Sequence, residues 1–318
     1  SIVSGCGASI GYSSALFVQI ATMWLIKRSK SQDNIQLGTL FVGIWWVIWQ
    51  MPISWLLTDI DTPLTIVEES SNAHREPQSY FKLEYFKYGW LSIFEALKHA
   101  RLLKDVVLFL VGWFIISDSI TTINSTAILF SKTELKMSTL SLIVVSILTM
   151  INAIAGAYFI PHFIAQKFNW SAKHTLLYII CWASVIPFYG ALGFIFKNIG
   201  LKHQFEMYIM AVWYGVSLGG LSAVSRSLFS LIIPKGREST FFSLFSITDK
   251  GSSIVGPVLV GFLTDRTHNI RYSFYLLFAL LIISLPIINS LDVTRGKLEA
   301  QELAAIEGNE EEEVLNVA

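Results

Sequence analysis

Long apolar segments constrain the fold of this chain more than any other feature. We identify about eight runs of about 20 or more mainly apolar residues, the length that a helix needs to cross the hydrocarbon core of a bilayer. These predicted spans are residues 4–26, 36–58, 105–131, 138–163, 174–196, 205–231, 240–264 and 272–291. Only 14% of the 318 residues are charged, whereas soluble domains average about 25%. The sequence therefore predicts an all-α polytopic membrane protein.

Polar segments divide these predicted spans into groups. Residues 59–104 form a long polar insert, and its last part carries apolar residues at helical spacing, which predicts an amphipathic helix on the membrane surface. Residues 293–318 contain the acidic run Glu310 to Glu313, which is typical of a solvated tail. More of the 23 lysines and arginines lie on the side of the insert and the tail, so we expect that side to be cytoplasmic. Between them, residues 105–292 are expected to form a six-helix bundle.

The predicted span 240–264 carries an acid and a base side by side, Asp249 and Lys250. Each charge costs about 2.5–3.5 kcal/mol at the centre of a bilayer, so both should face protein or water. At helical spacing, Ser243, Ser246 and Ser253 fall on the same side as this pair. Two interpretations remain open. The group lines a transport path, or Asp249 and Lys250 belong to structural ion pairs that lock helices together.

The predicted span 105–131 carries a third intramembrane charge, Asp118, about 20 Å along the helix axis. Its neighbours on the same helix face are polar, namely Ser117, Thr121, Thr122, Asn124 and Ser125. A carboxylate in this position is a functional candidate by default, and the alternative is an acid that is hydrogen-bonded only for helix packing. Arg226, near the end of the span 205–231, either extends to the membrane interface or pairs with a carboxylate.

Other motifs bear on catalysis, disulfide formation and cofactor binding. The sequence from Gly215 to Gly219, with Ser217 at its centre, matches a hydrolase nucleophile elbow, but that motif requires a strand–turn–helix context. Inside an apolar helix, two glycines at this spacing instead predict a close helix-packing face. Cys6 and Cys181 are predicted to be buried thiols outside any disulfide framework. No motif predicts a cofactor or a metal site, and the balanced charge gives no indication of nucleic-acid binding.

Three segments carry a more specific signal. They are WFIISDSITTI at 113–123, the block at 225–265 and NIRYSF at 269–274. Within the block stand Pro234 to Glu238, Asp249 to Gly251, Gly256-Pro257 and Gly261 to Asp265. These segments resemble the fungal vacuolar effluxer family, autophagy-related protein 22, of the major facilitator superfamily. The resemblance covers essentially the whole chain and is strongest after Phe114.

The resemblance implies a major facilitator-type helical bundle with about eight of twelve transmembrane helices present. Residues 1–58 would then be the last two helices of the N-terminal half, and the first four helices would be missing. It also implies a non-enzymatic protein of the vacuole membrane, which exports leucine and other small amino acids to the cytosol after autophagic breakdown by alternating access. Proton coupling is a further hypothesis. The expected partners are amino-acid substrates and the lipid bilayer.

The family offers no catalytic set, so the candidate site residues rest on physical arguments. The expected substrate or proton pathway comprises Asp118, Thr122, Ser125, Arg226, Ser246, Asp249 and Lys250. Four alternatives stay open: a major facilitator transporter of another small solute, a non-transporting membrane protein of autophagic-body breakdown, a scaffold that recruits partners, and a membrane lipase that uses Ser217.

Overall fold

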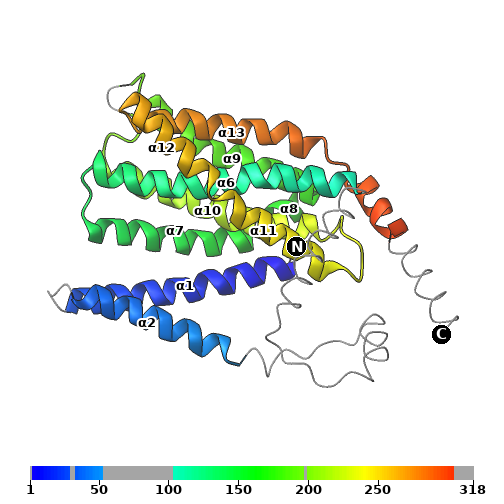
Figure 1. Cartoon of the computed structure of the whole chain (residues 1–318), viewed down its shortest axis with the longest axis horizontal. Coiled ribbons are helices and arrows are strands. Elements are labelled where there is room, and N and C mark those ends of the chain that lie inside the picture. Colours follow the sequence, from blue (N-terminus) through cyan, green and yellow to red (C-terminus); the bar gives the residue numbers. More distant parts are fainter. Residues whose placement is uncertain (1, 29–32, 53–102, 197–198, 304–318) are drawn as a thin grey trace, which may run out of the picture. The chain divides into compact units, whose positions relative to one another are not determined.

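The structure is a computed structural model and describes residues 2–28, 33–52, 103–196 and 199–303. Its regular elements in these ranges are helices (Figure 1). They are α1 (Ile2–Arg28), α2 (Asp33–Gln50), α6 (Lys104–Thr133), α7 (Thr139–Phe159), the π-helix η1 (Ile160–Ile164), α8 (Ala165–Lys167), α9 (Ala172–Leu192), α10 (Gln204–Phe229), α11 (Glu238–Ser252), α12 (Val255–Thr267) and α13 (Tyr272–Asn289). Residues 293–303 form a further helix, here called the tail helix. The predicted amphipathic helix and the acidic run lie outside the described residues.

Two compact units make up the chain, one of residues 1–16 with 96–318 and one of residues 17–95. In the smaller unit, α2 packs on the second part of α1 through aromatic rings, with centroids 5.1 Å apart for Phe17 and Trp45 and 5.8 Å apart for Trp45 and Trp49. Trp46 is exposed, as expected for a helix that faces lipid. The larger unit contains every helix from α6 onward.

Five segments of the described chain are long and apolar enough to cross a membrane: α6, α7 with its extension to Lys167, α9, α10 and α13. They confirm the predicted spans at 105–131, 138–163, 174–196, 205–231 and 272–291. The prediction of one continuous span at 240–264 is wrong, because this segment forms two short helices, α11 and α12. The break falls just before Gly256 and Pro257. Proline lacks the N–H that continues a helix, and glycine has the lowest helix propensity of the other residues.

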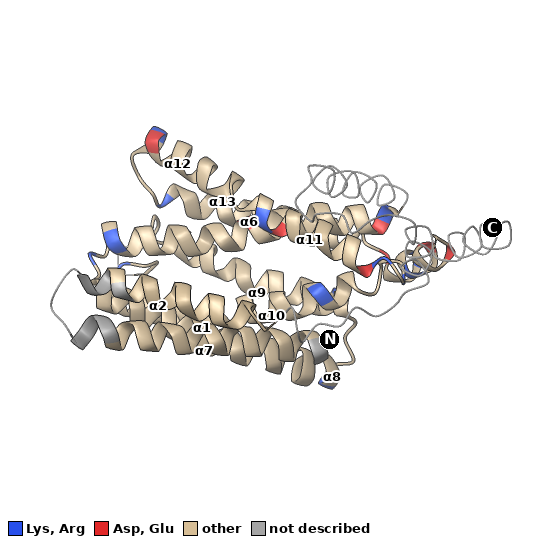
Figure 2. Cartoon of the chain, turned by 60° about the horizontal axis from the view of Figure 1, so that its bottom comes forward, with Lys and Arg blue, Asp and Glu red and all other residues tan. Residues whose placement is uncertain are grey.

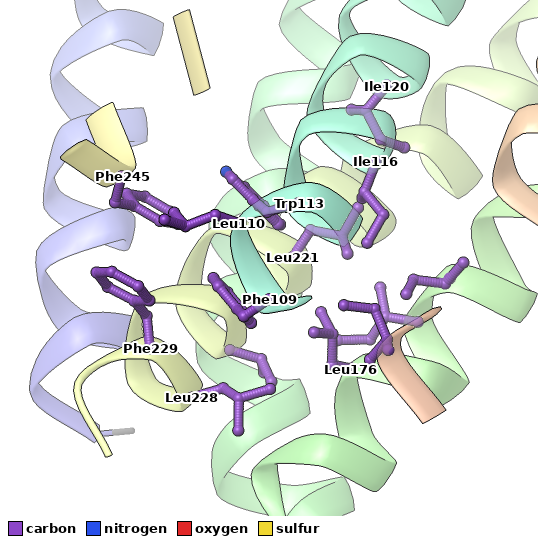
Figure 3. Close-up of a cluster of buried hydrophobic side chains, with 14 of the residues drawn as sticks. Phe109, Leu110, Trp113, Ile116, Ile120, Leu176, Leu221, Leu228, Phe229 and Phe245 are labelled. Carbon is purple, nitrogen blue, oxygen red and sulfur yellow. The ribbon is translucent and has the colours of Figure 1, made fainter. Parts of the chain in front are cut away.

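A buried cluster of aromatic and aliphatic side chains holds α6, α10 and α11 together (Figure 3). The ring of Phe109 on α6 lies 5.3 Å from that of Phe229 on α10, and Trp113 lies 5.4 Å from Phe245 on α11. Offset aromatic pairs of this kind add about 0.5–1.5 kcal/mol each beyond the buried area. The cluster therefore fixes α11 against α6 and orients the indole of Trp113.

Helices α7 and α10 pack through glycines, as the sequence predicted. A side chain at Gly219 would collide with the backbone oxygen of Ala153, and one at Gly215 would lie 2.8 Å from Cβ of Asn152. Ser217, between these glycines, is fully buried, and its hydroxyl donates to the carbonyl oxygen of Trp213 at 2.9 Å. The motif is a helix-packing face, and the geometry offers no support for a lipase that uses Ser217.

A buried acid and a buried base hold the connection between α9 and α10. The carboxylate of Glu206 accepts hydrogen bonds of 2.8 to 3.1 Å from the backbone N–H groups of residues 201–203, and one of 2.7 Å from the hydroxyl of Tyr189. The guanidinium of Arg271 donates to the carbonyl oxygen of Gly200 at 2.7 Å. Each buried charge therefore has hydrogen-bonding partners, which makes its burial tolerable.

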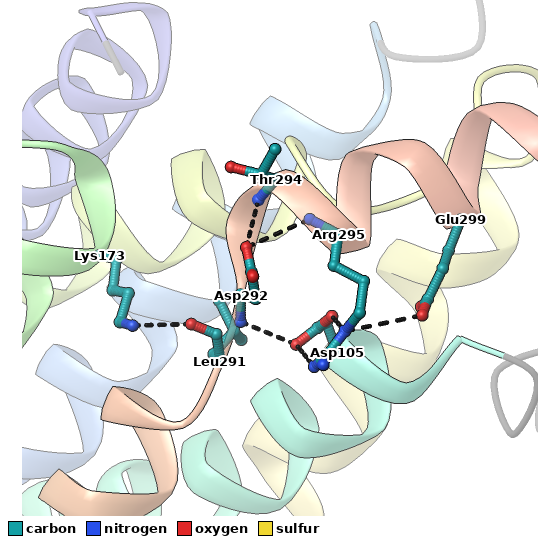
Figure 4. A network of polar contacts seen from close by, with 7 residues as sticks. All are labelled: Asp105, Lys173, Leu291, Asp292, Thr294, Arg295 and Glu299. Atoms are coloured by element: carbon teal, nitrogen blue, oxygen red, sulfur yellow. Dashed lines mark hydrogen bonds and ion pairs between the residues drawn. The ribbon is translucent and has the colours of Figure 1, made fainter.

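The tail helix is fixed to the opposite end of the bundle by an ion pair (Figure 4). Arg295 donates from Nε and Nη2 to the fully buried carboxylate of Asp105 at 2.7 and 2.8 Å, and this contact raises the pKa of Arg295. The backbone N–H of Asp292 donates to the same carboxylate at 2.9 Å. Lys173 donates to the carbonyl oxygen of Leu291 at 2.7 Å. The packed part of the chain therefore extends beyond the predicted boundary at residue 292.

Most of the charged residues lie near the ends of the helices, and few lie along the middle (Figure 2). This distribution is expected when the middle of each helix lies in hydrocarbon. The prediction that Cys6 and Cys181 are buried is wrong, since both are exposed. A thiol is a small apolar group, so an outward position on a membrane helix suits it as well as a core position.

Candidate functional site

The candidate site lies at the break between α11 and α12, where both helices cross α6 (Figure 1). Ser253 and Ile254 separate the two helices. A broken helix leaves carbonyl oxygens at one end and N–H groups at the other without partners inside the helix. In a membrane such groups are tolerated only where protein or water satisfies them. Side chains from the middle of α6 provide this function.

Asp118 accepts a hydrogen bond from a backbone N–H group in the first turn of α12. The residue is 3% exposed, and its carboxylate accepts a 2.8 Å hydrogen bond from the backbone N–H of Gly256. The carboxylate thus acts as a helix cap supplied by another helix, and its negative charge lies at the positive end of the α12 dipole. Asp118 therefore forms a hydrogen bond that packs α12 on α6, as the structural interpretation of this residue predicts.

Gly256 is required at this position by the close approach of α6. A Cβ added there would lie 2.8 Å from both carboxylate oxygens of Asp118 and would collide with the hydroxyl of Thr122. Thr122 is fully buried, and its hydroxyl has no hydrogen-bond partner in the described part of the chain. One turn of α6 therefore provides both the carboxylate of Asp118, which binds α12, and Thr122, against which Gly256 of α12 packs.

Asp249 lies on the other side of the break, near the end of α11, and its backbone carbonyl oxygen accepts from the hydroxyl of Ser117 on α6 at 3.1 Å. Its Oδ1 accepts hydrogen bonds from the indole of Trp113 at 3.1 Å and from the hydroxyl of Ser117 at 2.7 Å. Its Oδ2 lies 3.1 Å from Nζ of Lys250. The side chain of Asp249 is 21% exposed, whereas that of Lys250 is 85% exposed. The ammonium of Lys250 is thus exposed and contacts Asp249 on the same helix. This ion pair therefore does not lock two helices together.

The remaining candidates do not join this hydrogen-bond network. Ser125 and Ser246 are exposed, and their hydroxyls donate to carbonyl oxygens of their own helices, Thr121 and Phe242. Arg226 is also exposed and forms no ion pair with any described residue. The seven candidates thus divide into a buried group at the break and polar side chains exposed on α6, α10 and α11.

The first part of α1 approaches the same region of α10. The hydroxyls of Tyr12 and Ser222 lie 2.6 Å apart, and the hydroxyl of Ser4 donates to the carbonyl oxygen of Ala223 at 3.0 Å. Ser222 lies one turn before Arg226 on α10. Tyr12 therefore adds a polar group near the exposed cation, a role that no motif in the sequence indicated.

Three residues of the site were not among the candidates. Trp113 and Ser117 hold Asp249, and Gly256 binds Asp118. The Gly256-Pro257 pair inside an apolar run was a signal for the break, because proline removes a backbone donor there. Nothing in the sequence indicated that an indole 136 residues away would reach Asp249. Within the described residues, no group of three or more His, Cys, Asp or Glu side chains could hold a metal ion.

Similarity to known proteins shows the family to which the chain belongs. Residues 1–301 match the family described as "Vacuole effluxer Atg22 like". Proteins named autophagy-related protein 22 are 67% identical over 308 residues in Vanderwaltozyma polyspora, 60% over 315 residues in Saccharomyces cerevisiae and 44% over 311 residues in Yarrowia lipolytica. Each alignment covers 96% of this chain. The chain spans 59%, 60% and 52% of the length of these relatives, respectively.

The fold and the buried charges define a multi-pass helical membrane protein with a discontinuous helix, an architecture typical of transport proteins. The chain belongs to the vacuole effluxer family of autophagy-related protein 22. This family is one of membrane transporters, and membership identifies a multi-pass protein of the vacuolar membrane.

Proposed function

We propose that the protein exports leucine and other small amino acids from the vacuole lumen to the cytosol after autophagic breakdown. The family description names an effluxer of the vacuole, and the relatives are named for autophagy. The observation that carries the proposal is the break between α11 and α12, bound on both sides by α6. Transporters commonly place their substrate and ion sites at such breaks in the middle of the membrane.

The charges at the break have distinct proposed roles. An amino acid carries an ammonium and a carboxylate, so its site needs groups of both signs. Asp249 and Asp118 are the proposed partners of the ammonium or of a coupled proton. Lys250 and Arg226 are the proposed partners of the carboxylate, since both are exposed. Among the described residues, Lys250 pairs with Asp249 alone, and Arg226 pairs with no acid. Thr122, Ser125 and Ser246 add hydroxyls on the same helices.

The break also offers a mechanism for alternating access. A continuous helix bends only at considerable cost, whereas two short helices joined by Ser253 and Ile254 can rotate about this joint. Gly256 and Val260 are the buried residues of α12, so α12 is held mainly by a narrow stripe and by the Asp118 contact. Neutralising Asp118 weakens that contact, which would couple proton binding to the movement of α12.

Leucine efflux from sealed vacuolar membrane vesicles tests this proposal. We expect Asp118→Asn and Lys250→Met to abolish efflux while folded protein remains at its normal level in the membrane. Glu302→Gln and Lys202→Met remove exposed charges outside the break and should leave efflux unchanged. Normal efflux in both break variants would remove their assigned roles. Absence of amino-acid efflux from the wild-type vesicles would instead favour another solute or a non-transporting role.

A further inference from the structure

The larger unit contains a cavity that the site at the break does not include. Its volume is about 300 Å³, at the lower end of the range for small-molecule sites. It lies between the second half of α6 and the first halves of α7 and α10, near the α6–α7 connection. The lining includes Ile123, Leu142, Ile186, Met207, Met210 and Tyr214.

None of the described residues that line this cavity is charged. Its hydroxyls are also largely occupied, because Ser131 donates to the carbonyl oxygen of Ala127 at 2.6 Å, Thr149 to that of Val145 at 3.0 Å and Tyr214 to that of Ile120 at 3.1 Å. A charged group placed inside would lose its hydration without gaining a partner, which costs several kcal/mol. The cavity therefore accepts uncharged, mainly apolar groups.

Methionines give the cavity an adaptable wall. Met150, Met207 and Met210 all contribute to the lining. Methionine is unbranched and changes rotamer readily, so it fits apolar groups of different shapes. This composition favours a set of related apolar groups over a single one.

The position of the cavity relates it to the break. Asn124 lines the cavity and is exposed on α6, six residues beyond Asp118 and hence about 9 Å along the axis. Thr121 and Ser125 are exposed beside it. A polar path on α6 therefore leads from the charged groups at the break to the mouth of an apolar cavity.

We propose that this cavity is the specificity-determining side-chain site of the transporter, which admits uncharged apolar side chains and sets their upper size. The inference rests on the proposed amino-acid efflux. In this arrangement the backbone ammonium and carboxylate of the substrate stay on the polar face of α6, and the side chain enters between α6, α7 and α10. Lysine, arginine and glutamate are excluded because no lining group compensates their charge.

Competitive transport by the reconstituted protein in proteoliposomes tests this inference. Ala211 is 5% exposed and lines the cavity, so Ala211→Phe fills it. We expect the KM for leucine to rise about tenfold or more, the usual effect of losing apolar contacts in a selective pocket, while the KM for alanine changes little. The matched control is Val212→Phe, at the adjacent position, which is exposed and outside the lining.

A second variant keeps the test independent of how well Ala211→Phe folds. Met210→Ala enlarges the cavity and should lower the KM for phenylalanine relative to that for leucine. An unchanged ratio of leucine to alanine in Ala211→Phe, together with an unchanged ratio of phenylalanine to leucine in Met210→Ala, would overturn the inference and leave the cavity to lipid or to packing. Efficient transport of lysine by the wild type would overturn it as well. A wild type that transports no amino acid would instead refute the proposed efflux.

Discussion

The carboxylate of Asp118 on α6 accepts a 2.8 Å hydrogen bond from the backbone N–H of Gly256 at the start of α12. This contact joins a buried acid on α6 to a backbone donor in the first turn of α12. It explains how a broken helix is stable within an apolar bundle, because the donor is satisfied and the charge meets a favourable dipole. The same contact makes α12 sensitive to the charge of Asp118.

Substitutions of Asp118 should separate its structural and functional roles. Asp118→Asn loses the charge but keeps a side-chain oxygen that can accept from Gly256, so we expect a smaller loss of stability than in Asp118→Ala. Asp118→Ala removes the cap and should lower the free energy of unfolding by about 0.5–2 kcal/mol. Thermal unfolding in detergent measures both variants. If Asp118→Asn is as unstable as Asp118→Ala, the negative charge itself holds α12.

Gly256→Ala should disrupt the crossing of α6 and α12. The added methyl collides with Thr122 and crowds Asp118, and overpacking of this kind costs about 1–3 kcal/mol. Gly261→Ala is the matched control, because a Cβ at Gly261 on the same helix meets no atom within 4 Å. A double variant with Thr122→Ala should recover part of the lost stability. Equal stability of the two glycine variants would contradict the close approach.

Trp113→Phe and Ser117→Ala each remove one donor from Asp249. The aromatic packing of residue 113 on Phe245 is largely kept in Trp113→Phe, so the expected loss is that of one hydrogen bond to a charged group, about 1.5–3 kcal/mol. The loss should disappear when Asp249 is also changed to alanine, and a double-mutant cycle by thermal unfolding measures this coupling. An unchanged effect in the Asp249→Ala background would mean that Trp113 acts through packing alone.

Arg295→Ala should detach the tail helix from the bundle. Among the described residues, Asp105 would keep the backbone N–H of Asp292 as its one hydrogen-bond donor, and an uncompensated buried acid is destabilising. We expect faster hydrogen exchange and proteolytic cleavage in residues 293–303. Asp105→Asn in the same chain removes the unpaired charge and should restore part of the global stability without restoring protection of the tail helix. Lys297→Ala, an exposed change on the same helix, serves as the control.

The sequence alone determined the class of this protein, because long apolar runs admit only helices in a membrane and buried charges mark polar interiors. It also identified Asp118 and Asp249, and it gave the helix-packing role of Gly215 and Gly219. These features are local, so spacing along one helix is sufficient to find them.

Only the tertiary structure showed which groups meet. Asp118 binds a backbone donor 138 residues away, and a backbone N–H carries no signature of its partner in the sequence. The sequence also placed Ser125, Ser246 and Arg226 on polar faces, but the described helices leave them exposed and outside the network at the break. Helical periodicity gives the face of a side chain, whereas its partner depends on how two helices cross, and that is set by close packing at residues such as Gly256.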